Sequence, residues 1–270
     1  MTVLSAIRRL YVPVQPTVSG HNGQVGYVEH LPAPELQPYI YCYWQLQTRE
    51  QLQEPFVYRV VADGCIDIYL ERCNPAAAYV MGFCRRYTEF ALENSFDYIG
   101  IRFLPGMLPL LFGVHAAELS NRYEALDSVL PQLAAFLAAQ ADPALPVTQL
   151  AALLDAYFLG RLGAVARADM RFYGALTMIL ERSGVLNIET ELNTGLSARQ
   201  LRRVFAQYVG DTPKTFSKVV RFQHVLHAKP SAQSLKYNKV FLDAGYYDQA
   251  HFIKEFRNLY GVTPGHAFGR

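Results

Sequence analysis

The chain has 270 residues, of which 51% are hydrophobic and 18% are charged. This length suits about two domains on the usual scale of ~150 residues each, and the composition excludes wholesale disorder. No apolar stretch approaches the ~20 residues of a membrane-spanning helix. We therefore expect neither a secretory signal nor a membrane partner. The four cysteines form no CxxC pair, so we expect reduced thiols in a cytoplasmic protein.

Charge is unevenly distributed along the chain. Residues 1–167 contain 11 Lys and Arg against 15 Asp and Glu, a net charge of −4. Residues 168–270 contain 14 against 8, a net charge of +6, and they include all six lysines. A basic segment of this kind is typical of proteins that bind nucleic acid, although a basic face can also be simply solvated.

The first region with a clear pattern, residues 24–105, is expected to form strands. Short runs rich in Tyr, Val, Ile and Phe alternate with turn clusters containing Pro, Gly and Asn. The runs are 39–44, 56–61, 65–70 and 98–103. This spacing indicates a β-sandwich or a barrel of the cupin type. The many tyrosines suit a half-buried sheet or a partly polar cavity wall, and Asp67 would be anomalous if it faces inward.

Helical patterns follow from about residue 107. We expect helices over 107–112, 125–140 and 149–159, the second with Pro131 near its beginning, where proline is tolerated. The apolar stripe of the third suits a core or a dimer interface. A boundary near residue 165 gives two domains, a β-rich sensor domain with C-terminal helices (1–165) and an all-α domain (166–270). The fold class is therefore α+β.

The last hundred residues contain a repeated helical unit. The pattern predicts helices over 171–183, 188–193, 198–207, 214–227, 235–243 and 249–258. Ser197 and Asp248, 51 positions apart, are the expected N-caps of the helices over 198–207 and 249–258. Each unit ends in Gly-x-Thr-Pro, at 210–213 and 261–264. This internal duplication is the strongest organisational signal in the sequence.

Two short helices joined by a glycine-containing turn form the helix-turn-helix pattern, whose second helix can enter the major groove of DNA. Arg199 and Arg202 are expected on one outward face, where guanidinium groups can reach guanine or span phosphates. Gln249 can pair with adenine, and His251 and Lys254 can contact base edges or the backbone. The sequence therefore predicts double-stranded DNA as a partner.

The sequence also resembles a known family. The stretches GLSARQLRRVF (195–205), RF (221–222), GYYDQAHF (245–252) and GVTP (261–264), with Phe256, resemble the C-terminal domain of AraC/XylS transcriptional regulators. The stretches YVEHLP (27–32), YCYW (41–44), DGCID (63–67) and GIRFLPG (100–106) resemble a domain of uncharacterised function often found ahead of it.

The resemblance implies a seven-helix domain with two helix-turn-helix units, whose recognition helices enter successive major grooves about one turn (~34 Å) apart. The family's base-reading positions fall on Arg199, Arg202, Arg203, Gln249, Ala250, His251 and Lys254. The family usually has a small residue four positions before each turn glycine, where this chain has Glu191 and Phe241. We expect overpacking there and a weakened first unit.

Residues 1–165 give no pattern of catalytic residues, so we expect a regulator and not an enzyme, with no cofactor. The expected partners are double-stranded DNA, a small-molecule effector on the β-rich domain, RNA polymerase and a second copy of the chain. Two alternatives remain open. One is a thiol or metal sensor using Cys42, Cys65, Cys73 and Cys84 with His30. The other is an interaction protein whose DNA binding is weakened by Glu191 and Phe241.

Overall fold

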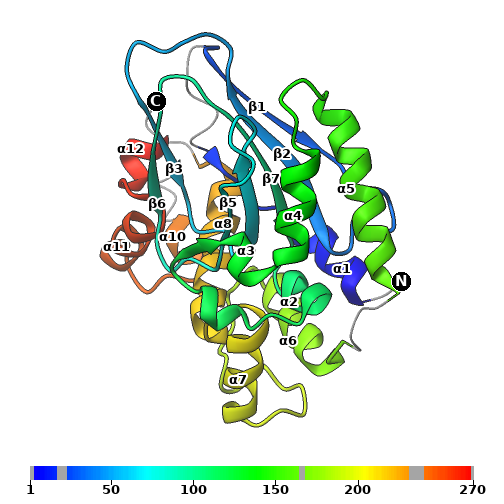
Figure 1. The fold of residues 1–270 in the computed structure, drawn as a ribbon. Helices are drawn as coiled ribbons and strands as arrows, with labels where there is room; N and C mark the ends of the chain where they lie inside the picture. The colour runs from blue at the N-terminus through cyan, green and yellow to red at the C-terminus, as the bar shows by residue number, and fades with distance from the viewer. Residues whose placement is uncertain (1–2, 17–22, 164–167, 231–239, 269–270) are drawn as a thin grey trace.

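The computed structural model describes residues 3–16, 23–163, 168–230 and 240–268. A β-rich N-terminal part with helices on one side is followed by an all-helical C-terminal part, as Figure 1 shows. The expected boundary near residue 165 lies outside the described residues. So does most of the helix expected over 235–243, of which the described end, Val240–Asp243, is helical as α10. No helix among the described residues is long and apolar enough to cross a membrane.

The strands form two antiparallel sheets. The larger sheet has the order β1-β2-β7-β4-β5-β8, and the smaller pairs β3 with β6. The bounds are β1 Val25–His30, β2 Ile40–Thr48, β3 Phe56–Val60, β4 Ile66–Glu71, β5 Ala78–Met81, β6 Thr88–Leu92, β7 Asp97–Phe103 and β8 Tyr123–Ala125. All four strands expected from the sequence are present, as β2, β3, β4 and β7.

The helices of the N-terminal part are α1 Val3–Leu10, α2 Met107–Phe112, the short 3-10 helix η2 Ala116–Leu119, α3 Leu126–Val129, α4 Pro131–Gln140 and α5 Val147–Leu162. Those of the C-terminal part are α6 Met170–Glu181, α7 Ala198–Tyr208, α8 Pro213–Ala228, α10, α11 Gln249–Tyr260 and α12 Pro264–Phe268. The helices expected over 107–112, 149–159, 171–183, 198–207, 214–227 and 249–258 correspond to α2, α5, α6, α7, α8 and α11.

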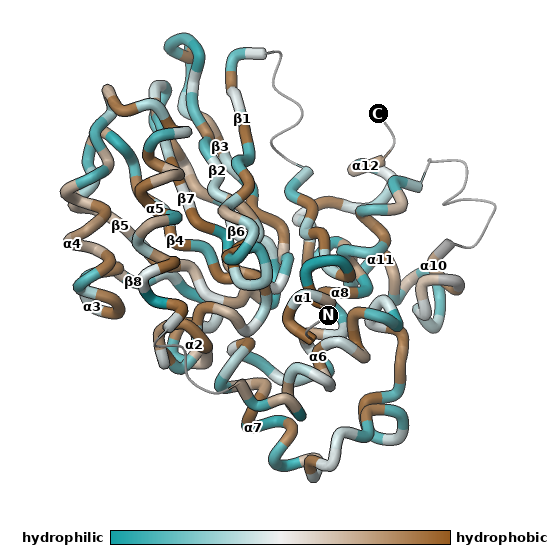
Figure 2. Tube along the Cα trace, turned by 90° about the vertical axis from the view of Figure 1, so that its right-hand side faces the viewer, coloured by the Kyte–Doolittle hydropathy of each residue, from teal (hydrophilic) through white to brown (hydrophobic). Residues whose placement is uncertain are grey.

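The large sheet has two different faces because successive side chains of a strand point to opposite sides. On β4, Ile66, Ile68 and Leu70 are buried in the core under α4 and α5. Asp67 and Tyr69 alternate with them and face the smaller sheet. In Figure 2 brown, hydrophobic positions accordingly recur along the strands of the large sheet and along the helices beside it.

The helix expected over 125–140 is divided in two. Leu130 leaves the helical conformation, with φ −136° and ψ 69°, and Pro131 begins α4. A proline inside a continuous helix would lack its N–H donor and clash with the carbonyl one turn earlier, whereas at a first helical position it costs nothing. The expectation that Pro131 lies within one helix was therefore wrong.

The short helix expected over 188–193 is also absent, and residues 187–191 form a single turn closed by Glu191 N–H to the Asn187 carbonyl, 2.8 Å. Side chains compete with the helix here. The Asn187 side chain accepts from Glu189 N–H (3.0 Å), and the Glu191 carboxylate accepts from Asn187 N–H (2.6 Å). Such local side-chain bonds offer the backbone an alternative to helix formation.

The two halves of the chain share one hydrophobic core. Phe83, Leu104 and Met107 from the N-terminal half pack in the same cluster as Phe172 and Phe216 from the C-terminal half. α1 packs against α6, and the Tyr173 hydroxyl donates to the Gly106 carbonyl at 3.0 Å. The β-rich half and the helical half are thus joined by a shared hydrophobic cluster.

A glycine on β7 fixes the position of the single tryptophan. Gly100 pairs with Trp44 on β2, and a Cβ at Gly100 would lie 2.2 Å from the indole ring. A glycine inside a strand often marks such a close approach. We predict that Gly100→Ala lowers the free energy of unfolding by about 1–3 kcal/mol, the usual cost of overpacking, measured by urea denaturation followed by circular dichroism.

Gly160 on α5 provides the control for this substitution, because a Cβ there meets nothing within 4 Å. Gly160→Ala is expected to raise stability by up to ~1 kcal/mol through helix propensity. An unchanged denaturation midpoint for Gly100→Ala would show that the packing of the Trp44 indole does not require a glycine at position 100.

Candidate nucleic-acid interface and ligand cavity

The two repeated helices begin in the same way. Ser197 caps α7 in a reciprocal capping box with Gln200, and the Asp248 carboxylate caps α11 by accepting from His251 N–H at 2.7 Å. The following Gly-x-Thr-Pro turns also match, because Thr212 caps α8 and Pro213 and Pro264 begin α8 and α12. The N-caps expected from the sequence are confirmed.

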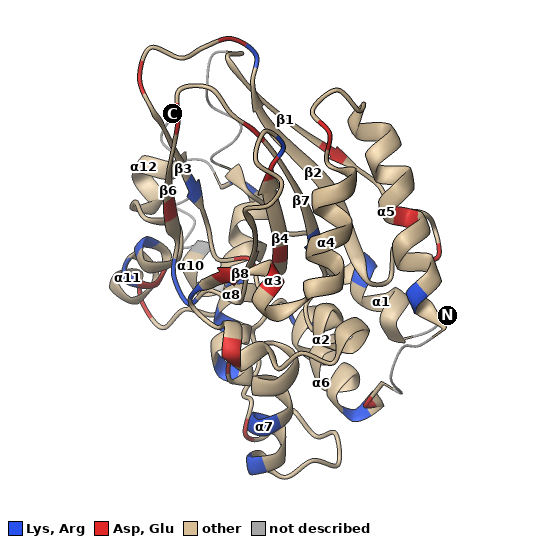
Figure 3. Ribbon diagram, in the orientation of Figure 1, with Lys and Arg blue, Asp and Glu red and all other residues tan. Residues whose placement is uncertain are grey.

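The first candidate recognition helix, α7, presents a basic face. Arg199, Arg202 and Arg203 are all exposed, while Leu201, Val204 and Phe205 on the other side are buried. Figure 3 shows blue, basic positions along α7. The amphipathic pattern leaves these three guanidinium groups directed away from the core, where a polyanion can reach them.

The second candidate recognition helix, α11, differs in its polar face. Gln249, Ala250 and Lys254 are exposed, but His251 is half-buried, with its Nε2 3.7 Å from the Glu255 carboxylate. Glu255 is 9% exposed and is also 3.2 Å from Nζ of Lys218 on α8. His251 is thus partly engaged within the protein, whereas Gln249 and Lys254 are available to a ligand.

The expected overpacking at Glu191 does not occur. Because the helix before the first turn is reduced to one turn, Glu191 lies on the surface, with its carboxylate 3.8 Å from Arg182 Nη1. Phe241, the equivalent residue in the second unit, is half-buried and stacks on Phe252 with ring centroids 6.3 Å apart. The second unit accommodates its large residue by aromatic packing.

The linking helix α8 lies between α7 and α11 and is tied to the N-terminal half through Gln223. This side chain is 2% exposed. Its Nε2 donates to the Ala62 carbonyl (2.8 Å), and its Oε1 accepts from Val14 N–H (2.7 Å). Ala62 N–H in turn donates to the Leu259 carbonyl of α11 at 3.2 Å. The segment at residue 62 therefore contacts both α8 and α11.

A second N-terminal segment, residues 82–87 between β5 and β6, reaches both helix-turn-helix units. We refer to it as the bridging loop. Arg85 forms an ion pair with the buried Asp211 in the turn after α7. Its carbonyl accepts from the Asn258 side chain (3.0 Å), and Tyr87 N–H donates to the Asn258 carbonyl of α11 (3.2 Å). No sequence pattern indicated these contacts, because the partners of the loop in the C-terminal half lie more than 100 positions away.

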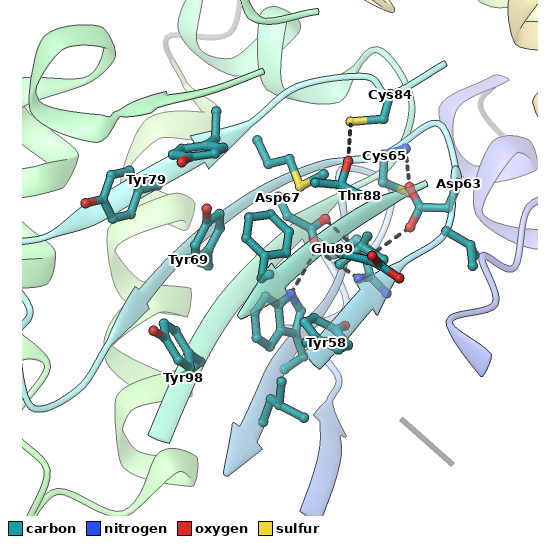
Figure 4. Close-up of a pocket in the computed structure, with 18 of the residues that line it drawn as sticks. Tyr58, Asp63, Cys65, Asp67, Tyr69, Tyr79, Cys84, Thr88, Glu89 and Tyr98 are labelled. Carbon is teal, nitrogen blue, oxygen red and sulfur yellow. Dashed lines mark hydrogen bonds and ion pairs between the residues drawn. The ribbon is translucent and has the colours of Figure 1, made fainter. Parts of the chain in front are cut away.

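The two sheets line a partly open cavity of about 410 Å³. Its walls come from β2, β4, β5, β7 and β8 of the large sheet and from β3 and β6 of the small one (Figure 4). The cavity is also lined by residues 61–63, which contact the C-terminal half, and by Gly82 and Cys84 of the bridging loop. The polar cavity wall expected from the many tyrosines is present.

The inward-facing Asp67 is compensated by a buried arginine. Asp67 lies directly opposite Arg102 in the β4–β7 register, and Arg102 Nη2 donates to its carboxylate at 2.9 Å. Trp44 Nε1 donates to the same carboxylate at 3.0 Å, and Asp63 lies 3.7 Å from Arg102 Nε. Burial raises the pKa of the Asp67 carboxyl; Arg102 opposes this shift and Asp63 adds to it.

The four cysteines are dispersed and unpaired. Cys42 and Cys65 are buried, Cys84 is half-buried and Cys73 is exposed. Burial raises the pKa of the Cys42 and Cys65 thiols, and it raises that of Cys84 to about 11. Within the described ranges, no group of three or more His, Cys, Asp or Glu residues is placed to hold a metal ion. The arrangement gives no support to a thiol or metal sensor.

Comparison with known proteins agrees with this architecture. Residues 28–125 match a domain of unknown function, DUF6597, and residues 193–270 match a helix-turn-helix domain. An uncharacterised HTH-type transcriptional regulator of Haemophilus influenzae is 36% identical over 103 residues, which is 37% of this chain and 34% of the relative. The chain thus matches only about a third of that relative's length.

Crystal structures of ToxT from Vibrio cholerae were also compared. One aligns over 91% of this chain and 98% of ToxT with a TM-score of 0.40 and 9% identity, and a second has a TM-score of 0.37 with 10% identity. Similarity at this level supports no assignment of individual residues or ligands.

The fold and the repeated capped helices define a two-domain protein with a C-terminal double helix-turn-helix. The two domain matches show that the chain contains an AraC-type helix-turn-helix domain at residues 193–270 and a DUF6597 domain at residues 28–125.

The thiols provide a test of the sensor alternative. A thiolate is the reactive form, so burial and a raised pKa make a cysteine slow to react. We predict that only Cys73 reacts rapidly with a disulfide reagent at pH 8, and that the other three react after unfolding. Cys73→Ser should remove the fast phase, and Cys84→Ser should leave it. A second fast thiol in the folded protein would contradict this prediction.

Proposed function

We propose that the protein is a transcriptional regulator that binds double-stranded DNA in the bacterial cytoplasm through α7 and α11, which enter successive major grooves. The observation that carries this proposal is the pair of capped helices with outward polar faces, one in each repeated unit. RNA polymerase and a second copy of the chain are further partners that the family resemblance suggests.

The exposed side chains of the two helices suit different contacts. Arg199, Arg202 and Arg203 can donate to guanine O6 and N7 or to phosphates. Gln249 can donate to and accept from adenine, the Ala250 methyl group can contact a thymine methyl, and Lys254 can contact base edges or phosphates. His251 contributes less because Glu255 engages it.

We further propose that a small molecule in the cavity between the sheets regulates DNA binding. The cavity wall and the contacts to the C-terminal half are made by the same two segments, residues 61–63 and the bridging loop. A ligand that displaces either segment would therefore change the position of α8, α11 or the turn after α7. A ligand can shift this equilibrium only by its difference in affinity for the two arrangements.

One observation favours a second candidate function. The helix that should precede α7 is reduced to a single turn, so the first unit lacks part of the support that a recognition helix normally has. In this second candidate, the first unit contacts a protein and α11 alone reads DNA. The two candidates differ in the effect of removing the α7 arginines.

We predict that Arg202→Ala weakens binding to duplexes selected by the wild-type chain from a random pool by about 1–3 kcal/mol, if Arg202 reads a base. The loss should be larger on selected than on scrambled duplexes, because phosphate contacts do not depend on sequence. Fluorescence anisotropy at several salt concentrations measures both. Arg49→Ala, an exposed arginine just after β2, is the matched control.

Unchanged affinity of Arg202→Ala, together with a loss for Lys254→Ala, would favour the second candidate, in which only α11 reads DNA. Salt-independent or undetectable duplex binding by the wild-type chain would overturn the regulator proposal itself.

The coupling between the halves can be tested through Gln223. Gln223→Leu removes the side-chain partners of Val14 and Ala62 in the interior, so we predict a loss of about 1–3 kcal/mol in stability. Fluorescence of Trp44 reports the N-terminal half, and circular dichroism reports the helices of both halves. Both transitions should shift together, and Gln149→Leu on the exposed side of α5 should shift neither. A shift seen by one probe alone would show that the halves unfold independently.

A further inference from the structure

The charge of the cavity wall constrains the chemistry of the proposed effector. Among the described residues that line the cavity, Asp63, Asp67 and Glu89 are acidic and Arg102 is the one basic residue. Glu89 is neutralised from outside by Arg59, whose Nη2 lies 2.6 Å from its carboxylate. One guanidinium therefore faces two buried carboxyl groups, so the wall carries a surplus negative charge when both are ionised.

Two of the three guanidinium nitrogens of Arg102 are engaged by Asp67. Its Nε and Nη2 both donate to Asp67. Its Nη1 has no hydrogen-bond partner but is buried from solvent, and the nearest carboxylate to it is that of Glu29 on β1, at 4.0 Å. An anion entering the cavity would meet two carboxyl groups, Asp63 and Asp67, and a single guanidinium that already pairs with one of them.

Aromatic rings form the other part of the wall. Tyr69, Tyr79, Tyr123 and Phe90 contact one another in a closed cycle, with ring centroids 5.7, 5.7, 6.0 and 6.1 Å apart. They come from four different strands, β4, β5, β8 and β6, and all line the cavity. In the view of Figure 4, Asp67 lies between Tyr69 and Asp63. The faces of such rings attract cations.

The aromatic cycle and Asp67 are close enough to act on one ligand. Asp67 and Tyr69 are two positions apart on β4 and so project from the same face, about 7 Å apart along the strand. An organic cation could place its charge between Asp67 and the rings. Its apolar part could then lie against Trp44 and Leu46, which also line the cavity.

We propose that the cavity binds an apolar organic cation, such as an aromatic or quaternary amine, as the effector. This inference rests on the proposed regulation by a small molecule and specifies the class of that molecule. The cavity volume and the aromatic wall would each also suit a neutral ligand. The surplus carboxyl group together with the aromatic rings favours an organic cation.

The test is a calorimetric titration of the full chain with three probes of similar size. They are benzyltrimethylammonium, its neutral carbon isostere neopentylbenzene, and the anion 3-phenylpropionate. Trp44 fluorescence provides a second readout because the ring lines the cavity. We expect the cation to bind at least ten times more tightly than either other probe.

Asp63→Asn tests the role of charge. It neutralises the surplus carboxylate while leaving the Asp67–Arg102 pair intact, and an asparagine can still accept from Gln15 or Cys65 as Asp63 does. Affinity for the cation should fall roughly tenfold, which is about 1.4 kcal/mol, with little change for the neutral isostere. Glu50→Gln, an exposed acid outside the cavity, should change neither affinity.

Tyr79→Leu provides an independent variant if Asp63→Asn does not fold, since Tyr79 touches neither carboxylate. It should weaken binding of the cation several-fold more than binding of the isostere. Equal or tighter binding of the neutral or anionic probe, or no binding of the cation, would overturn the proposal. Duplex binding is measured separately, so the ligand class can fail while the regulator proposal stands, and the reverse.

Discussion

The bridging loop and the segment at residue 62, between β3 and β4, constrain the rest of the molecule because they join the β-rich half to the helical half. Arg85 forms an ion pair with Asp211, which follows α7. The Arg85 carbonyl accepts a hydrogen bond from the Asn258 side chain of α11. Gln223 fastens the helix between them to Ala62. The relative position of α7 and α11 therefore depends on contacts outside the C-terminal domain as well as on the hydrogen bonds within it.

The same two segments line the cavity between the sheets, and the strand register determines which polar side chains face that cavity. Asp67 and Arg102 are cross-strand partners, and one residue of slippage would turn either of them into the core under α4 and α5. Trp44 occupies the space that Gly100 leaves open and adds a third group to the same cluster. A buried ion pair of this kind adds little net stability and is better understood as fixing one arrangement of the strands.

Local signals in the sequence predicted local structure well. The caps at Ser197 and Asp248, the proline starts at Pro213 and Pro264 and the four apolar strand runs depend on neighbouring residues only, and all are present. The errors arose where neighbours compete. Pro131 ended one helix and began another, and the side chains of Asn187 and Glu191 replaced a helix with a turn. Periodicity alone does not weigh such competition.

The candidate site was only partly accessible to the same reasoning. The outward polar faces of α7 and α11 follow from helical spacing, but the engagement of His251 by Glu255 and the contacts of the bridging loop depend on tertiary packing. Asp67 could be identified as unusual from its place in an apolar strand. Its partner Arg102, 35 positions away, could not be paired with it without the register of the sheet.

The continuous interior also limits how this protein can be recombined. Exchanging the C-terminal third for that of another regulator at the segment near residue 165 would separate Phe83 and Met107 from Phe172 and Phe216. Each fragment would then present an apolar surface to water, and such surfaces promote aggregation. A functional hybrid would have to transplant the matching residues of α1, α2 and the bridging loop together with the reading helices.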